Sequence, residues 1–202
     1  INSYGGYLGY TPNQLNLGQW LPTVALRRSG AWVTHDVSLI GEQTVSDVAD
    51  WDVTLVVSDA PDGVHLAAPG QAVERDGNRW RYQLTDAREF TLSMSPQYQV
   101  LSTITEGGVD VEVYTFAARP VQLAAETVDG AQQALDAAAQ ALAMYSDLFG
   151  AYPLERFVVV QGDFPDGMEF SGIVFVSDQW FRSNTGSPQS YLTIITVHET
   201  EH

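Results

Sequence analysis

Short alternating apolar segments dominate the first 120 or so residues of the chain. In the segment 51–57 every second residue is apolar, which is the period of a half-buried β-strand. The segments 31–40, 79–84 and 90–94 are also dense in β-forming residues. Turn-forming sequences such as Pro61-Asp62-Gly63 recur between them at short intervals. This pattern predicts antiparallel strands arranged as a β-sandwich or saddle.

A β-hairpin is predicted at the end of this region. Two strand-like segments, 99–106 and 109–116, are joined by Gly107-Gly108, a dipeptide typical of tight turns. The pattern then changes near Arg119-Pro120. We therefore expect a β-rich domain over residues 1–120, with its start truncated, and a different unit over residues 121–202.

Helical spacing appears in the second unit. The segment 129–149 is alanine-rich with one apolar stripe, and Gly150 follows it, so we expect a packed helix. Two apolar runs, 157–161 and 173–176, then predict short buried strands. The sequence thus predicts an α+β protein.

A last helix is predicted at the C-terminal end, with Ser187 as its cap and Pro188 at its first position. Its apolar residues and two histidines share one helical face. These residues are Tyr191, Ile194, Ile195, His198 and His202. We therefore expect the histidine face to be the face that packs on the core.

Composition and charge limit the classes of partner. The chain has 202 residues, of which 45% are hydrophobic, so it can bury a sizeable core. Its formal net charge of −16 disfavours nucleic acid and anionic membrane surfaces as partners. The absence of cysteine excludes disulfides and thiolate metal sites. No run of 18 or more apolar residues occurs, so no transmembrane segment is expected.

The strongest chemical signal is the sequence His198-Glu199-Thr200-Glu201-His202, which has the pattern H-E-x-x-H. Histidines four residues apart lie on one helical face and can bind one zinc ion, and the adjacent glutamate can act as general base. Catalytic zinc of this type has three protein ligands. Since the sequence ends at His202, we expect the third ligand beyond it, in a longer metallopeptidase of which this chain is a fragment.

A second candidate segment is Asp166-Gly167-Met168-Glu169-Phe170-Ser171-Gly172. Its glycines would allow the backbone to approach a ligand closely while the Glu169 carboxylate faces that ligand. The same sequence is also compatible with a loop or bulge whose glutamate is simply solvated. The segment alone leaves both interpretations open.

A Gly-Met-Glu segment followed after about thirty residues by an H-E-x-x-H helix resembles the alanyl aminopeptidase family of zinc metallopeptidases, which are gluzincins. Tyr152-Pro153, the segment 157–160 and the stretch 17–22 are also similar to that family. The resemblance implies a β-rich domain packed on the beginning of a thermolysin-like catalytic domain. It also implies that the remainder of that catalytic domain is a partner of this chain.

The resemblance further implies a role for each site residue. His198 and His202 would bind Zn²⁺, and Glu199 would activate the attacking water. Glu169 would hold the free amino group of a peptide substrate, while the backbone at Gly167 and Met168 would line the extended peptide.

Several features qualify this expectation. The sequence departs from the family pattern at Asp166, Phe170 and Glu201, which bears on substrate preference.

His35 and His65 lie in strand or turn patterns and are not expected at the metal site. Two other functions remain open: a non-catalytic binding or scaffold protein, and a thermolysin-like endopeptidase in which Glu169 has only a structural role.

Overall fold

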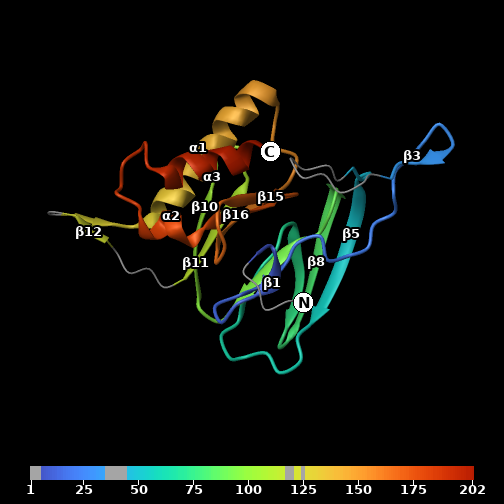
Figure 1. Ribbon diagram of the computed structural model, residues 1–202, viewed down its shortest axis with the longest axis horizontal. Coiled ribbons are helices and arrows are strands. Elements are labelled where there is room, and N and C mark those ends of the chain that lie inside the picture. Colours follow the sequence, from blue (N-terminus) through green and yellow to red (C-terminus); the bar gives the residue numbers. More distant parts are fainter. Residues whose placement is uncertain (1–5, 35–44, 117–120, 124–125) are drawn as a thin grey trace.

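The computed structural model describes residues 6–34, 45–116, 121–123 and 126–202. It shows a mixed α+β protein, as expected, built mostly from antiparallel strands with a few helices. Figure 1 shows the helices gathered at one side and strands β1, β5 and β8 at the other.

The first part of the chain forms a four-stranded sheet, in the order β1-β2-β9-β6, and a three-stranded sheet, in the order β5-β8-β7. Their strands are β1 (Leu8–Tyr10), β2 (Leu15–Leu17), β5 (Ala49–Val56), β6 (His65–Ala67), β7 (Gln71–Asp76), β8 (Arg79–Ala87) and β9 (Leu92–Ser95). The predicted strands at 51–57, 79–84 and 90–94 are therefore confirmed. As the alternation indicated, Trp51 and Val53 on β5 pack toward the hydrophobic core around Trp80 and Phe90.

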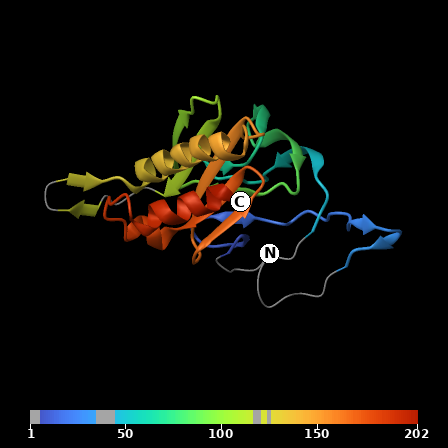
Figure 2. The same cartoon turned by 90° about the horizontal axis from the view of Figure 1, so that it is seen from above.

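In the described part of the segment 31–40, residues 31–34, a short strand lies at the start. β3 (Arg27–Arg28) and β4 (Ala31–Trp32) form a small hairpin through Ser29 and Gly30, whose φ angles are 49° and 83°. Figures 1 and 2 show that this hairpin projects from the body of the protein. Residues 35–40, where the strand was expected to continue, lie outside the described residues.

The central sheet has five strands in the order β10-β11-β14-β16-β15. They are β10 (Tyr98–Ile104), β11 (Asp110–Phe116), β14 (Arg156–Gly162), β15 (Gly167–Phe170) and β16 (Ile173–Ser177). The predicted hairpin is confirmed as β10–β11, and the predicted buried strands are β14 and β16. The pairs β11–β14 and β14–β16 are parallel, whereas β15 runs antiparallel at the edge. This sheet includes strands from both sides of position 120. A separate two-stranded pair consists of β12 (Val121–Leu123) and β13 (Glu126–Val128).

Helices α1 (Gly130–Phe149), α2 (Asp178–Arg182) and α3 (Tyr191–Glu201) lie on one face of the central sheet (Figures 1 and 2). The predicted helix at 129–149 is confirmed as α1. The Asp129 carboxylate caps it by accepting the backbone N–H of Ala131 at 3.0 Å, and it ends at Gly150, where φ is +107°. Among the described residues, no helix combines the length and apolar character that crossing a membrane requires.

The strand residues alternate between the two faces of the central sheet. Val111 and Val159 belong to the core beneath α1 and α3, whereas Tyr114, Val158 and Phe175 belong to a core on the opposite face. The sheet is thus buried on both sides, and its edge strand β15 lies next to α3.

Candidate active site

The helix carrying the histidines begins later than the sequence suggested. Its N-cap is Ser190, whose Oγ accepts the backbone N–H of Thr193 at 3.3 Å. Ser187, which was expected to cap it, lies in the preceding turn, where its carbonyl accepts the N–H of Ser190 at 2.9 Å. Pro188 therefore belongs to this turn and not to the first helical position. The prediction of the helix was right and that of its start was wrong.

One side chain of α1 fixes the start of α3. The Nε2 atom of Gln133 lies 2.9 Å from the Ser187 carbonyl, 2.9 Å from the Ser190 hydroxyl and 2.8 Å from the Thr193 hydroxyl. Its Oε1 atom accepts the Asn184 amide at 2.8 Å. Because these contacts join four positions around the N-terminus of α3, Gln133 sets where the helix starts relative to α1.

The histidine face of α3 is not its core face, contrary to the expectation from spacing. Tyr191 is 46% exposed, Ile194 is 52% exposed, and both histidines are exposed. The buried residues are Leu192, Ile195, Thr196, Glu199 and Thr200. The two threonines can be buried because each hydroxyl donates at 2.7 Å to the helix carbonyl four residues earlier. Their polarity in the sequence concealed the true core face.

The two histidine side chains lie close together at the end of α3. Their Nε2 atoms are 3.3 Å apart, and their rings are nearly perpendicular, at 87°. Two nitrogens bound to one tetrahedral zinc at about 2.0–2.1 Å would be about 3.3–3.4 Å apart. The same distance also allows one imidazole to donate a hydrogen bond to the other. Within the described part of the chain, no three His, Cys, Asp or Glu side chains are grouped to hold a metal ion.

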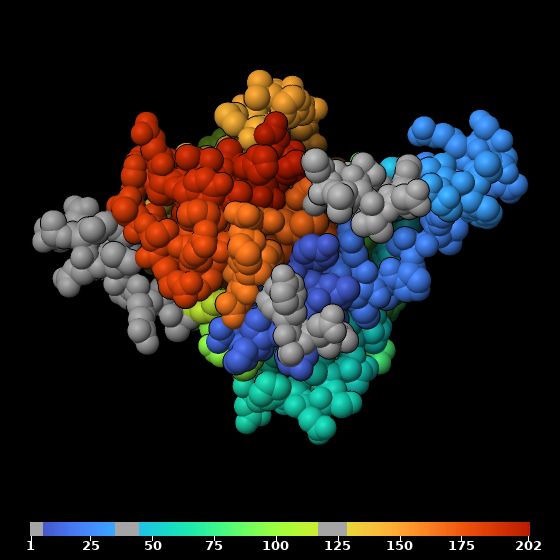
Figure 3. Space-filling model, in the orientation of Figure 1, coloured from blue at the N-terminus to red at the C-terminus, as the bar shows by residue number. Residues whose placement is uncertain are grey.

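Glu169 lies beside this pair because of the register of β15. The strand pairs with β16 so that Glu169 lies opposite Val174, and its Oε1 atom is 3.7 Å from Nδ1 of His202. The candidate segment is therefore a sheet edge and not a loop, and its glutamate adjoins the second histidine. Figure 3 shows the end of α3, in deep red, at the surface beside the orange β15 region.

Glu199 is buried against the backbone of β15. It is 5% exposed, and a Cβ atom placed on Gly167 would lie 2.1 Å from its Oε1 atom and 2.5 Å from its Cδ atom. No real side chain tolerates such distances, so residue 167 must be glycine while Glu199 keeps this position. The close approach expected at Gly167 thus involves Glu199, whereas the Met168 side chain packs into the core on the sheet's other side.

A cavity of about 300 Å³ lies between these groups and the β-rich part of the protein. Glu169, Glu199 and His202 line it, together with Asp86 near the end of β8 and Glu89 in the turn after β8, whereas His198 does not. Glu89 in that turn accepts the backbone N–H of Ser171 at 2.7 Å and so anchors the turn to the end of β15. Glu89 has no motif around it in the sequence, so its place beside the cavity could not have been predicted.

The other two histidines are not expected at this site. His65 lies on β6 and does not line this cavity, and His35 lies outside the described residues. In comparisons with known proteins, no family model and no curated protein matches the chain. A function can therefore be inferred only from the paired imidazoles, Glu199 and Glu169.

Proposed function

We propose that this chain carries part of the active site of a zinc-dependent aminopeptidase, with a thermolysin-like arrangement of helix and sheet edge. The main observation is the 3.3 Å separation of the His198 and His202 Nε2 atoms, which suits two ligands of one tetrahedral zinc. The third ligand would be a glutamate outside the printed sequence, in the remainder of the catalytic domain. The chain alone would therefore lack activity.

Zinc, when bound, would lower the pKa of its water to near ~7 and polarise the scissile carbonyl. Glu199 would accept the proton of that water and later deliver it to the leaving amine. Its position supports this role, because it follows a proposed ligand directly and lines the cavity although its side chain is largely buried. The packing against Gly167 would hold the carboxylate in one orientation.

Glu169 would select substrates with a free N-terminus. Its carboxylate lies on the cavity beside His202, where an ammonium group could form a charge-assisted hydrogen bond with it. Asp86, Glu89 and Glu199 line the same cavity with one arginine, Arg88, so its acidic side chains outnumber the basic one and favour a cation. An internal peptide bond would leave Glu169 without this partner, which disfavours endopeptidase activity.

The edge of β15 would hold the peptide itself. β15 is the last strand of the central sheet, and β16 pairs with only one of its two sides. An extended peptide could pair with the other side by strand addition, with its backbone along Gly167 and Met168. Its first residue would then reach Glu169.

The experiment uses the full-length protein that contains this sequence, supplied with zinc, and a peptide with either a free or an acetylated N-terminus. Cleavage of the free peptide alone supports the aminopeptidase. Cleavage of both supports an endopeptidase, in which Glu169 would only orient His202 across the 3.7 Å between them. Cleavage of neither supports a non-catalytic binding protein. The Glu169→Gln variant should lower kcat/KM for the free peptide by at least about tenfold.

Zinc binding by the chain itself provides a second test. With two imidazoles and no third ligand grouped with them among the residues that the structure describes, we expect a Kd weaker than about 1 μM in a calorimetric titration. The His198→Ala variant should weaken it further, whereas Glu106→Gln on the exposed β10–β11 turn should not. Tighter binding of one zinc per chain would contradict an incomplete ligand set.

A further inference from the structure

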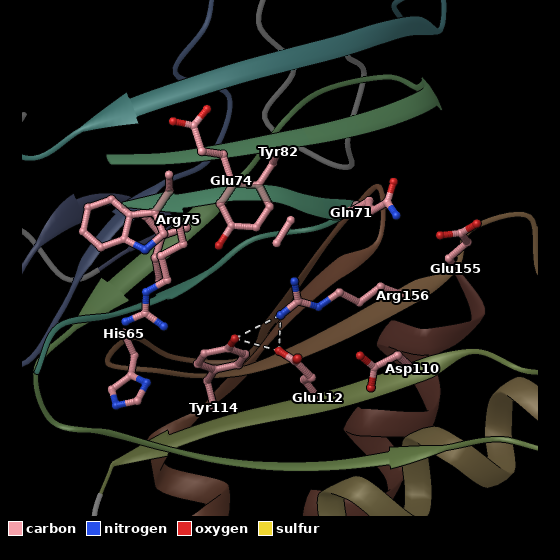
Figure 4. Close-up of a pocket in the computed structure, with 14 residues that line it drawn as sticks. His65, Gln71, Glu74, Arg75, Tyr82, Asp110, Glu112, Tyr114, Glu155 and Arg156 are labelled. Atoms are coloured by element: carbon pink, nitrogen blue, oxygen red, sulfur yellow. Dashed lines mark hydrogen bonds and ion pairs between the residues drawn. The ribbon is translucent and has the colours of Figure 1, made fainter. Parts of the chain in front are cut away.

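A second and larger cavity lies elsewhere in the protein. Its volume is about 420 Å³, and it lies between the β7–β8 pair and the face of β11 and β14 in the central sheet (Figure 4). It shares no lining residue with the active-site cavity. Its size falls within the range of small-molecule sites. Its ionisable lining residues include Glu74, Arg75, Asp110, Glu112, Glu155 and Arg156, and His65 also lines it.

Three hydrogen-bonded side chains, Arg156, Glu112 and Tyr114, line the middle of this cavity (Figure 4). The Arg156 guanidinium forms an ion pair with the Glu112 carboxylate and also donates to the Tyr114 hydroxyl at 3.1 Å. Tyr114 in turn donates to Glu112 at 2.6 Å. The Arg156 and Glu112 side chains are only 13% and 18% exposed. Each member therefore fixes the others, and the charges of Arg156 and Glu112 offset each other.

The remaining charges are separated between the two ends. Glu74 forms an ion pair with Arg79, which leaves Arg75 at one end and Asp110 and Glu155 at the other. Within the described residues, none of these three side chains makes an ion pair or hydrogen bond. Figure 4 shows Arg75 near His65, the Arg156 guanidinium near the middle, and Asp110 and Glu155 on the far side. The cavity thus has one positive and one negative end.

Asp110 is more buried than Glu155. Burial raises the pKa of its carboxyl, and the nearby Glu112 carboxylate raises it further, while Arg156 acts in the opposite direction. A cation placed beside Asp110 would relieve this unfavourable environment. An ammonium group is a suitable partner for the Asp110 end.

The dimensions suit a short peptide. Asp110 and Tyr114 are four residues apart on β11, which corresponds to about 13 Å along an extended strand. An extended chain of three residues spans at most about 10 Å, and a hydrogen bond of about 3 Å at each terminus lets it reach groups about 16 Å apart. A dipeptide or tripeptide would therefore place its two charged termini toward opposite ends of the cavity, with its middle over the Arg156 guanidinium (Figure 4).

We propose that this cavity binds a free dipeptide or tripeptide by its termini, with the carboxylate held by Arg75 and the ammonium held by Asp110 and Glu155. The proposal does not depend on the metal site. Binding would pair Arg75 with the peptide carboxylate, and Asp110 and Glu155 with the peptide ammonium. These ion pairs would stabilise the complex. A peptide blocked at one end would leave one set of these charges unpaired.

The test is titration of the chain with trialanine, followed by amide NMR and calorimetry. We expect signals of β11 residues near Asp110 and Tyr114 to shift. The Kd should rise about tenfold for N-acetyl-trialanine, for trialanine amide, and for the Arg75→Gln and Asp110→Asn variants. The amide spectrum also reports whether each variant keeps the fold.

Two controls separate this site from the active site. Arg28→Gln removes an exposed arginine far from the cavity in sequence and should leave the Kd unchanged. Glu169→Gln alters the active-site cavity, which would itself bind a free N-terminus, so it should leave the shifts of the β11 signals unchanged. Binding that is lost in Glu169→Gln but kept in Arg75→Gln would overturn the proposal. Equal affinity for free and blocked peptides, or no shift of β11 signals at millimolar trialanine, would overturn it as well.

Discussion

Substitution of Gly167 by alanine should displace the Glu199 carboxylate. The new methyl carbon would lie 2.1 Å from Oε1, 2.5 Å from Cδ and 2.9 Å from Cγ of Glu199, whereas ordinary contacts begin near 3.4 Å. The nearest oxygen must therefore move by about 1.3 Å, the difference between 2.1 and 3.4 Å. Glu199 lies on the packed face of α3, so this movement requires a new side-chain rotamer or a shift of β15.

This movement should affect both stability and activity. Overpacking of a well-packed site costs about 1–3 kcal/mol, so the free energy of unfolding in urea should fall by that amount. If the full-length protein is the proposed aminopeptidase, a shift of about 1 Å in its general base can cost on the order of 10²-fold in rate, and kcat/KM should fall accordingly. Gly107→Ala is the matched control. A Cβ at Gly107 has its nearest neighbour at 3.7 Å and should cause little change.

A double-mutant cycle tests the cause. If the clash with Glu199 is responsible, Gly167→Ala should cost much less in a Glu199→Ala background, because the opposing carboxylate is gone. An equal loss of stability in both backgrounds would refute the reasoning. It would show that alanine at position 167 acts through the backbone or through another neighbour.

Three further predictions concern the rest of the structure. Gln133→Leu should lower the free energy of unfolding by about 1–3 kcal/mol, because it removes the hydrogen bonds at the start of α3, whereas Gln132→Leu on the exposed face should have little effect in the same urea titration. Leu192→Ala should cost about 2–5 kcal/mol, since this side chain is 1% exposed between α3 and the sheet; a loss below 1 kcal/mol would contradict its place in the core. Hydrogen bonds from Arg81 and Gln83 lower the pKa of Asp52 from 3.8 to about 2, so their stabilisation is present above pH 3.8 and disappears as the pH falls through 2. An NMR titration should show the Asp52 midpoint near 2 and a rise toward 3.8 in Arg81→Gln.

Much of the fold could be predicted because its signals are local. The alternation of β5, the glycine turn between β10 and β11, and the Asp129 and Gly150 ends of α1 each depend on neighbouring residues alone. The buried face of α3 could not be predicted in the same way. Thr196 and Thr200 have polar side chains, and they suit the core only because their hydroxyls donate hydrogen bonds to the helix backbone.

The candidate site, too, was predictable where it depends on local sequence and not where it depends on contacts between distant segments. The spacing of His198, Glu199 and His202 is a local property of one helix, so the sequence revealed it. The approach of Glu169 to His202 depends on the pairing of β15 with β16 and on the packing of α3, which no short pattern encodes. The position of Glu89 and the cavity around Arg156 result from contacts between distant segments, so no local pattern could predict them.

The membership of β10 and β11 in the central sheet determines how the protein can be shortened. A truncated version beginning after position 120 would lose two of the five strands and leave β14 with an unpaired border. Val111 and Val113 would also be missing from beneath α1. An exposed, unpaired edge strand rich in valine promotes self-association. Work on the histidine-bearing half in isolation should therefore retain the hairpin that begins at Tyr98.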